Sequence, residues 1–155
     1  MSVDPRFRQL FEEEYERVFR SAYLLCRDRA TAEDCAQEAF ARCLERWDRL
    51  GGQPWVGGWV TSTALNLARR SLRRRKVGTL PDRTERDLDA SVDLRRGIRG
   101  LPRRQQQAMV LYYGADLPIA EVAAVMRCEE GTVKAHLARA REALRGHLEG
   151  ERVEG

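Results

Sequence analysis

One stretch of the chain gathers the side chains best suited to bind a polyanion. Residues 50–76 hold six basic and no acidic residues, although the net charge of the 155-residue chain is only +4. The six are Arg69, Arg70, Arg73, Arg74, Arg75 and Lys76. Guanidinium groups bind phosphates through paired hydrogen bonds, so the cluster predicts a nucleic-acid contact on one surface. The plainer alternative is a solvated helix end. Codon bias would explain why arginine is abundant, but not why it is clustered.

A second basic surface is predicted near the C-terminus, on the spacing of a helix-turn-helix. Ala123 is the small residue that lets one short helix pack closely on the next, and Val133 holds the second helix ten residues later. Arg127 lies in the turn, where glycine would be easiest, so we expect some backbone strain there. The alternative is an amphipathic helical hairpin with a solvated basic face.

The second helix of this motif would enter the major groove of DNA by its N-terminal part. Lys134 and Arg139 have the donors that read guanine edges. Arg141 and Arg145 are better placed for phosphates. Val133 and Leu137 belong to the predicted inward face.

Covalent chemistry finds little support in the sequence. There is no P-loop, nucleophile triad or cluster with metal-ligand spacing. Asp34 and Glu38 are paired acids at i, i+4, but such a pair on an exposed helix is typical of solvated charge or a partner contact. The four cysteines form no CxxC pair, and we expect Cys26, Cys35 and Cys43 to be core residues. We predict no enzymatic activity, no metal and no cofactor.

The composition limits the fold class. Hydrophobic residues make up 43% of the chain and charged residues 34%, whereas aromatic residues are only 7%. Strand-like alternation is scarce, so we predict an all-α protein. The N-terminus lacks an apolar signal core and no run is long enough to span a bilayer. We therefore expect a cytoplasmic protein without a membrane segment.

In the first half the apolar spacing predicts three helices. Asp4 is the expected N-cap of a first helix of about 20 residues, with Pro5 at its first position. Thr31 opens a capping box for the second, whose apolar face runs through Leu44 to Trp47. The third helix can begin at Pro54 and ends in the basic cluster.

The second half is predicted to be a separate small helical domain. Residues 77–91 have little periodicity and resemble a flexible linker between a domain at 1–76 and another at 92–150. In the second domain we expect a helix near Val92–Arg99 and another opening at Leu101-Pro102. The motif helices are expected at Pro118–Met126 and from Glu130 to Leu148.

The order of these segments resembles an extracytoplasmic-function sigma factor, the minimal form of the sigma-70 family. The matching segments are DRATAEDCAQEAFARCLERWD, WVTSTALNLARRSLRRRK, LPRRQQQAMVLYY and IAEVAAVMRCEEGTVKAHLARAREAL. The resemblance implies two helical domains and a transcription initiation factor that binds core RNA polymerase, recognises promoter DNA and assists its melting.

The resemblance also implies roles for residues of the first half. Residues 31–49 look like the helix that docks on the β′ clamp helices of RNA polymerase, and there they offer Asp34, Gln37, Glu38 and Arg42. Trp59 and Asn66 stand at positions that receive an unpaired base of the −10 element, and seven residues apart they share one helix face. Trp55 competes with Trp59 for the stacking role. The basic cluster would hold strand phosphates.

For the second half, the resemblance implies recognition of the −35 element as duplex. The corresponding helix carries Thr132, Lys134, His136, Arg139, Arg141 and Arg145, with Ala135 and Ala138 between them. The two alanines offer room or a thymine-methyl contact, so readout would depend on Lys134 and Arg139. Further implied partners are the β flap and an anti-sigma factor, for a chain that is a monomer when free.

Two other functions stay open at this point. A stand-alone helix-turn-helix repressor or activator would be a stable dimer on a palindrome, so the size of the protein in solution separates it from a sigma factor. A ligand-sensing domain would also have no use for the basic stretch with Trp59 and Asn66. An enzyme acting on nucleic acid would need a site that the sequence does not display.

Overall fold

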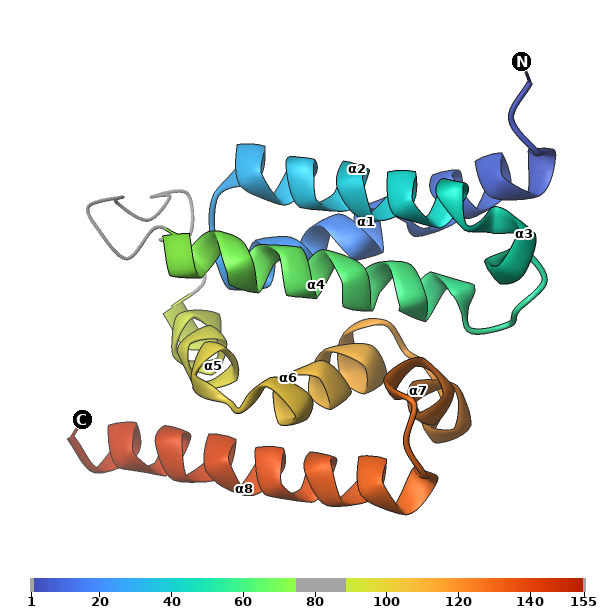
Figure 1. Ribbon diagram of the computed structural model, residues 1–155. Helices are drawn as coiled ribbons and strands as arrows, with labels where there is room; N and C mark the ends of the chain where they lie inside the picture. The colour runs from blue at the N-terminus through green and yellow to red at the C-terminus, as the bar shows by residue number, and fades with distance from the viewer. Residues whose placement is uncertain (1, 75–88, 155) are drawn as a thin grey trace.

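The computed structural model describes residues 2–74 and 89–154, with side chains described for 2–74 and 94–145. Every element within these residues is helical, as the composition predicts (Figure 1). In chain order they are α1 (Pro5–Cys26), α2 (Arg29–Glu45), α3 (Trp47–Leu50), α4 (Val56–Arg74), α5 (Asp89–Gly100), α6 (Arg103–Met109), the π-helical turn η2 (Val110–Gly114), α7 (Ile119–Met126) and α8 (Glu130–Glu154). No helix among the described residues is both long enough and apolar enough to cross a membrane.

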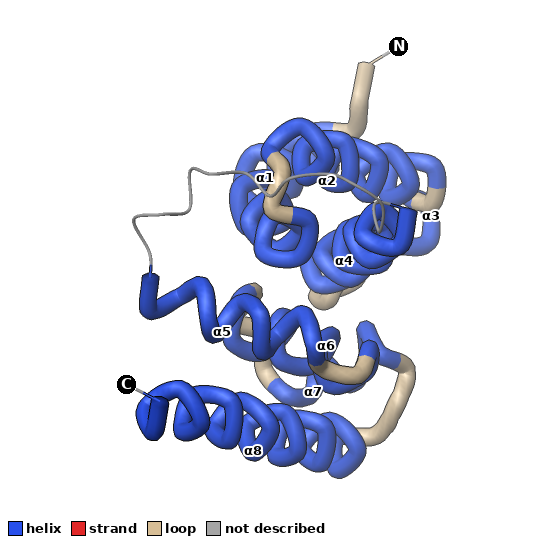
Figure 2. Tube along the Cα trace, turned by 90° about the vertical axis from the view of Figure 1, so that its left-hand side faces the viewer, coloured by secondary structure: helices blue, strands red, loops and turns tan. Residues whose placement is uncertain are grey.

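The first bundle consists of α1, α2 and α4, which Figure 2 shows nearly end-on. Its core is built largely from small residues, which let helix axes approach closely. Fully buried examples are Val18, Ala22, Ala32, Ala36, Ala39, Val60, Ala64 and Ala68. Cys26, Cys35 and Cys43 are also buried, as predicted, and burial raises the pKa of the Cys43 thiol to about 11. All three thiols are packing residues, and the raised pKa makes that of Cys43 a poor nucleophile.

Asp4 fixes the start of this bundle. Its carboxylate accepts from the Arg6 backbone N–H at 2.8 Å, so the predicted N-cap is confirmed. The same carboxylate accepts from Trp47 Nε1 at 3.1 Å and so connects α1 to α3. The pKa of Asp4 is lowered, first by its hydrogen bonds to Arg6.

The predicted cap of α2 is wrong by three residues. Asp28, in extended conformation, accepts from the Thr31 backbone N–H at 3.2 Å, and the Thr31 hydroxyl also donates to that carboxylate. Arg27 takes φ 55°, which turns the chain within two residues. Since a carboxylate was already available at Asp28, the helix begins before Thr31, and the Thr31 hydroxyl supports the cap instead of forming it.

Other boundaries also differ from the predicted ones. α2 ends at Glu45, before Trp47, and α4 begins two residues after Pro54. Leu44 is 42% exposed, contrary to its predicted place on the buried face, because it lies one turn beyond the Phe40 ring that aromatic residues of α1 cover. α5 begins at Asp89, three residues earlier than expected, and α8 continues past Leu148. Residues 77–88 of the predicted linker lie outside the described residues.

The second bundle contains the expected helix-turn-helix in α7 and α8. Ala123 is buried and Val133 is fully buried, in a cluster with Val122, Met126 and Leu137. The turn starts at Arg127, with φ 56° and ψ 50°. The predicted strain is therefore present, because a side chain in this left-handed conformation crowds its own carbonyl.

The two bundles also pack against each other (Figure 2). α4 contacts α7 and η2, and α1 contacts α5 and η2. The main hydrophobic cluster of the first bundle extends to Ile98, Leu101, Val110, Ala140 and Leu144. The core is thus continuous across two segments that the sequence suggests are independent.

The strained turn leads to a stability prediction. Replacing Arg127 with glycine should raise the free energy of unfolding by about 0.5–1 kcal/mol, because glycine adopts positive φ without steric cost. For a chain of this length, each kcal/mol of added stability raises the Tm by roughly 2–4 °C. The rise in Tm is measured by calorimetry. The control variant is Arg96→Gly, which replaces an exposed side chain of α5 and should lower the Tm. A lower Tm for Arg127→Gly would contradict the interpretation.

Candidate nucleic-acid interface

A small groove between α2 and α4 brings several predicted site residues together. Its volume is about 180 Å³. The lining residues are Arg42 of α2 and Arg46 just after it, with Trp59, Thr63, Asn66, Leu67 and Arg70 of α4. The prediction that Trp59 and Asn66 share one helix face is confirmed. The groove therefore combines an aromatic surface, an amide and guanidinium groups, which can stack, pair and neutralise phosphate.

Trp59 lies at this groove with part of its ring against the core. It is half-buried and packs against the core of the first bundle, and its backbone carbonyl accepts from Thr63 Oγ1 at 2.9 Å. Trp55 packs against the same core but does not line the groove. The geometry of this groove therefore favours Trp59 over Trp55 as a stacking surface.

Asn66 has a partner that the sequence did not suggest. Its Oδ1 accepts from the Arg103 guanidinium at 3.0 Å, across 37 positions of the chain. Arg103 opens α6 and was not among the predicted site residues. The amide that the resemblance assigns to a promoter base is thus bonded to the second bundle.

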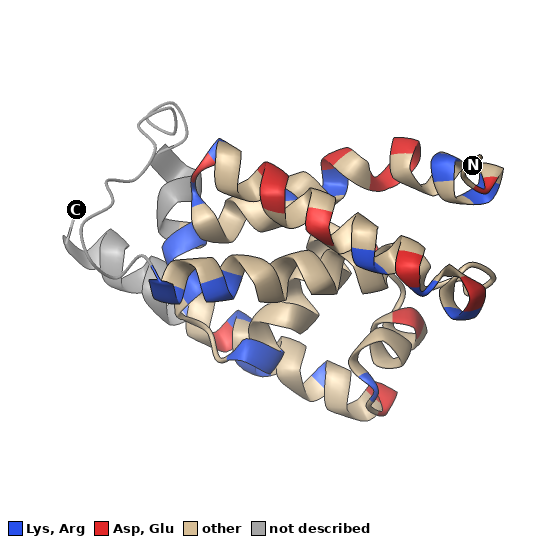
Figure 3. Cartoon of the chain, turned by 45° about the horizontal axis from the view of Figure 1, so that its top comes forward, with Lys and Arg blue, Asp and Glu red and all other residues tan. Residues whose placement is uncertain are grey.

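The basic end of α4 points partly to solvent. Arg70, Arg73 and Arg74 are exposed, and Figure 3 shows basic residues gathered at this end of α4. Arg69 instead donates to the Leu101 carbonyl at 3.4 Å. Burial, followed by the charges of Arg103 and Arg73, lowers the pKa of Arg69. Arg75 and Lys76 lie outside the described residues.

The outer face of α2 carries the predicted docking residues. Asp34, Gln37 and Glu38 are exposed. Arg42 is half-buried and its Nε donates to Glu38 Oε1 at 3.1 Å, an i,i+4 pair worth about 0.3–0.5 kcal/mol. All four side chains therefore share one outward face, beside the exposed Leu44.

The N-terminal half of α8 divides as predicted. Val133, Leu137, Ala140 and Leu144 are buried, whereas Thr132, Lys134, Ala135, Ala138 and Arg139 are exposed. In Figures 1 and 2 this helix lies on the side of the second bundle away from the first. Its polar face is therefore open to a DNA groove.

Two predicted DNA contacts on α8 have neighbours within the protein. Arg141 Nε donates to the Tyr113 hydroxyl at 2.6 Å, and its guanidinium lies 5.4 Å from the Tyr113 ring centroid. His136 is half-buried, with no hydrogen-bond partner at Nδ1. Burial, followed by the charges of Arg104 and Arg139, lowers the pKa of His136. The neutral form of His136 is therefore favoured over the charged form in the free chain. Arg145 is exposed.

Among the residues described, no three His, Cys, Asp or Glu side chains gather in a way that could hold a metal ion. What this interface can do is bind, through charge, stacking and hydrogen bonds.

Family models match both halves of the chain. The model described as Sigma-70 region 2 matches residues 10–77, and that described as Sigma-70, region 4 matches residues 91–144. The chain is 26% identical over 156 residues to the ECF RNA polymerase sigma factor SigW of Bacillus subtilis, covering 86% of this chain and 83% of SigW. It is 30% identical over 140 residues to a probable RNA polymerase sigma-C factor of Mycobacterium bovis, covering 83% and 76%.

A solved structure shares the fold. CnrH in complex with the cytosolic domain of CnrY superimposes with a TM-score of 0.72 at 21% identity, covering 93% of this chain and 88% of that one.

The environment of His136 leads to a pH prediction. Because its pKa is lowered in the folded state, the unfolded chain binds more protons as the pH falls past about 6.5, so acid favours unfolding. Between pH 7.5 and 5.5 the urea midpoint of the wild type should fall further than that of His136→Gln. His147 is present in both proteins and cancels in the difference. Equal pH dependence would disprove the role of His136.

Proposed function

Because the chain belongs to the extracytoplasmic-function branch of the sigma-70 family, we propose that its α2–α4 groove receives an unpaired base of the −10 element while α8 reads the −35 duplex. The family supplies promoter recognition in transcription initiation and consists of regulatory factors, not enzymes. Family membership thus supports this proposal over the repressor and the enzyme. The observation that carries the proposal is the meeting of Trp59, Asn66 and Arg70 in one groove.

In the proposed −10 contact each side chain has a separate role. A base leaving the duplex loses its stacking partners, which the half-buried Trp59 ring replaces. The Asn66 amide has a donor and an acceptor for the base edge. Arg70, Arg73 and Arg74 neutralise phosphates of the opened strand, together with Arg69, Arg75 and Lys76. Melting is then assisted by capture of the flipped base rather than by catalysis.

In the proposed −35 contact α8 lies in the major groove. Lys134 and Arg139 donate to guanine edges, Thr132 bonds a base or phosphate, and the exposed alanines leave room for a thymine methyl. Arg145 and the free end of the Arg141 guanidinium contact phosphates. His136 is half-buried and contributes to the packing of this helix.

The proposed partners follow from the same family membership. Asp34, Gln37, Glu38 and Arg42 would dock on the β′ clamp helices, and the second bundle on the β flap. CnrH was solved in complex with a partner's cytosolic domain, which supports an anti-sigma factor for this chain also. We expect a cytoplasmic protein, monomeric when free.

The proposal predicts which substitutions abolish promoter-specific transcription. Wild-type protein and core RNA polymerase are incubated with a genomic fragment library, and start sites are mapped. The starts should share two upstream boxes. Asn66→Ala and Arg139→Ala should each reduce them by about tenfold or more, since each removes about 1–3 kcal/mol of base discrimination. The controls Gln9→Ala and Arg8→Ala change exposed residues on α1 and should retain full activity.

The two defects can be told apart on altered templates. A template with the −10 region already unpaired should partly rescue an Asn66→Ala defect in opening but not the Arg139→Ala defect. Changing a −35 guanine should weaken the wild type and leave Arg139→Ala nearly unaffected. If neither box is required, or core polymerase is not bound at all, the proposal fails.

The basic end of α4 predicts a salt effect. Neutralising phosphates releases counterions, with a log–log slope of about 0.7–0.9 per phosphate contact. Arg73→Gln/Arg74→Gln should therefore lower the slope of promoter binding by the polymerase complex by about 1.4–1.8, measured by fluorescence anisotropy between 50 and 200 mM salt. An unchanged slope would show that these arginines do not contact the DNA.

A further inference from the structure

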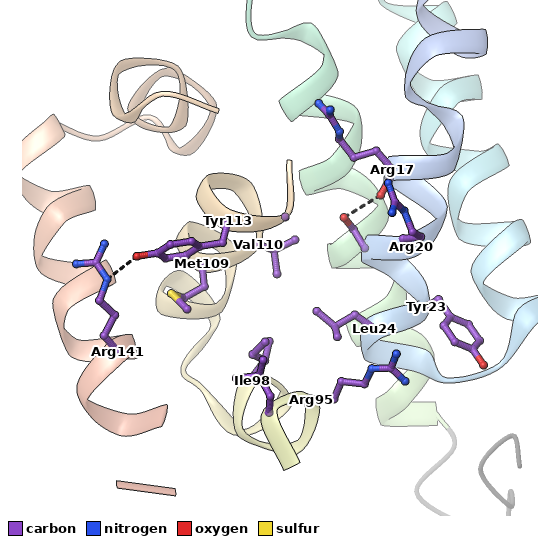
Figure 4. Close-up of a pocket in the computed structure, with 13 residues that line it drawn as sticks. Arg17, Arg20, Tyr23, Leu24, Arg95, Ile98, Met109, Val110, Tyr113 and Arg141 are labelled. Carbon is purple, nitrogen blue, oxygen red and sulfur yellow. Dashed lines mark hydrogen bonds between the residues drawn. The ribbon is translucent and has the colours of Figure 1, made fainter. Parts of the chain in front are cut away.

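A cavity of about 590 Å³ lies beside α1, between that helix and the second bundle (Figure 4). Its walls come from α1, α5, α6, η2 and α8. This volume falls within the range of about 300–1,000 Å³ that is typical of small-molecule sites. The cavity shares no lining residue with the α2–α4 groove, so a ligand bound in it would leave the proposed −10 site unoccupied.

The middle of the cavity is apolar. Leu24 of α1 faces Ile98 of α5 and Val110 of η2 across it (Figure 4). Two further lining side chains, Leu94 and Tyr113, are 38% and 51% exposed. Only three other large apolar side chains are exposed in the part of the chain whose side chains are described. Apolar surface that is exposed at one concave place indicates a binding site.

Guanidinium groups surround this apolar middle. The described lining residues include four arginines and no acidic residue, and we call these four the rim arginines: Arg17, Arg20, Arg95 and Arg141. In Figure 4 their charged ends lie around the apolar side chains rather than among them. An arginine placed in this way packs its aliphatic stem on an apolar wall and keeps its charge at the edge. The rim therefore attracts an anion.

Arg20 is the rim arginine that is available to a ligand. Arg17 Nη1 donates to the Ala115 carbonyl at 3.0 Å, and the same atom lies 3.5 Å from Glu14 Oε2. Arg141 is bonded to the Tyr113 hydroxyl, as described above. Arg20 is exposed and has no hydrogen bond or ion pair with any described residue. It precedes Leu24 by four residues, which places both side chains on one face of α1.

The size and the walls of the cavity select the class of anion. An α-helix with its side chains is about 10 Å across, so two turns of it need roughly 850 Å³, which is more than this cavity offers. A nucleotide base needs flat aromatic surfaces on both faces, whereas the middle of the cavity is aliphatic. An alkyl chain adapts to such walls and gains free energy from each methylene that it buries.

We propose that this cavity binds an amphipathic anion with one alkyl chain, namely a fatty-acid carboxylate. The alkyl chain lies between Leu24, Ile98 and Val110. The carboxylate accepts hydrogen bonds from the Arg20 guanidinium, which is the pairing that arginine makes best. Leu94 and Tyr113 cover the part of the chain nearest to solvent. The site rests on the cavity and its charges alone, and it does not depend on the promoter contacts proposed above.

Binding is tested by isothermal titration calorimetry of the full-length protein with dodecanoate, below the concentration at which this probe forms micelles. One dodecanoate should bind per chain. Dodecanol has the alkyl chain without the charge, and it should bind about tenfold more weakly or worse, because the charged hydrogen bonds are lost. Acetate has the charge without the chain and should not bind measurably. If dodecanoate does not saturate, or dodecanol binds equally well, the proposal is wrong.

The chain provides an internal control for the place of binding, because it has two isoleucines. Ile98 lines the cavity, whereas Ile119 of α7 packs against the cluster of the helix-turn-helix and does not line it. In a protein with isotope-labelled isoleucine methyl groups, dodecanoate should shift the Ile98 signal in the NMR spectrum and leave the Ile119 signal in place. A shift of Ile119 alone, or of both signals equally, would place the ligand elsewhere and overturn the site.

Two variants separate the contact with the carboxylate from the contact with the alkyl chain. Arg20→Gln should weaken dodecanoate binding about tenfold and leave dodecanol binding unchanged. Leu24→Trp fills the cavity with apolar volume and should abolish the binding of both probes, with folding checked by circular dichroism. The matched control is Arg8→Gln, which removes an exposed charge of α1 outside the cavity and should bind like the wild type.

The outcomes that contradict the assignment are specific. Wild-type affinity of Arg20→Gln for dodecanoate would show that Arg20 does not hold the carboxylate. Equal weakening in Arg20→Gln and Arg8→Gln would show a general effect of charge rather than a site. Saturable binding of an acidic amphipathic peptide, with none of dodecanoate, would assign the cavity to a helix and overturn the proposal.

Discussion

Helix α4 is the element on which the rest of the structure depends, because different sides of it serve three different surfaces. Val60, Ala64 and Ala68 enter the main hydrophobic cluster, and their small size lets α1 and α2 pack closely on α4. The groove residues Trp59 and Asn66 lie on an adjacent side. On the third side, Gly58 and Ser62 contact the second bundle. A substitution in α4 therefore rarely affects one property alone, since neighbouring positions belong to different surfaces.

The distribution of charge follows from this arrangement. The basic residues stand in the last turns of α4, where the partial negative charge of a helix C-terminus favours cations. Acidic residues are interspersed with basic ones on α1 and α2 (Figure 3), whereas residues 50–76 hold basic residues alone. The end of α4 is therefore the part of the first bundle best suited to attract a polyanion. The weak net charge of the chain conceals this separation.

Asn66 lies between the groove and the second bundle. It lines the groove between α2 and α4, where we propose that its amide receives a base, and its Oδ1 accepts from Arg103 of the second bundle. In the same way, a glycine at 58 lowers the helix propensity of α4 but allows the second bundle to approach. Both residues would be poor choices for a helix that only had to fold.

Much of the fold was determined by the sequence alone. Apolar spacing placed α1, α2, α4, α7 and α8, and the Ala123–Val133 pair identified the helix-turn-helix, because these signals are local and depend on helical periodicity. Helical periodicity also put Trp59 and Asn66 on one face, since seven residues are close to two helical turns. The errors arose where two local signals competed. Asp28, rather than the predicted Thr31, caps α2, and Leu44 lies at the edge of the buried face instead of within it.

Only the tertiary structure decided which face of α4 the second bundle would cover. Arg103 and Asn66 are 37 residues apart, and Gln107 and Leu117 are even further in sequence from their α4 partners Ser62 and Gly58, so no local pattern could join them. The stripe of Gly58, Ser62, Asn66 and Arg69 was visible in the sequence as small and polar residues. What it packs against depended on the relative placement of two bundles, which long-range packing sets and helical periodicity does not.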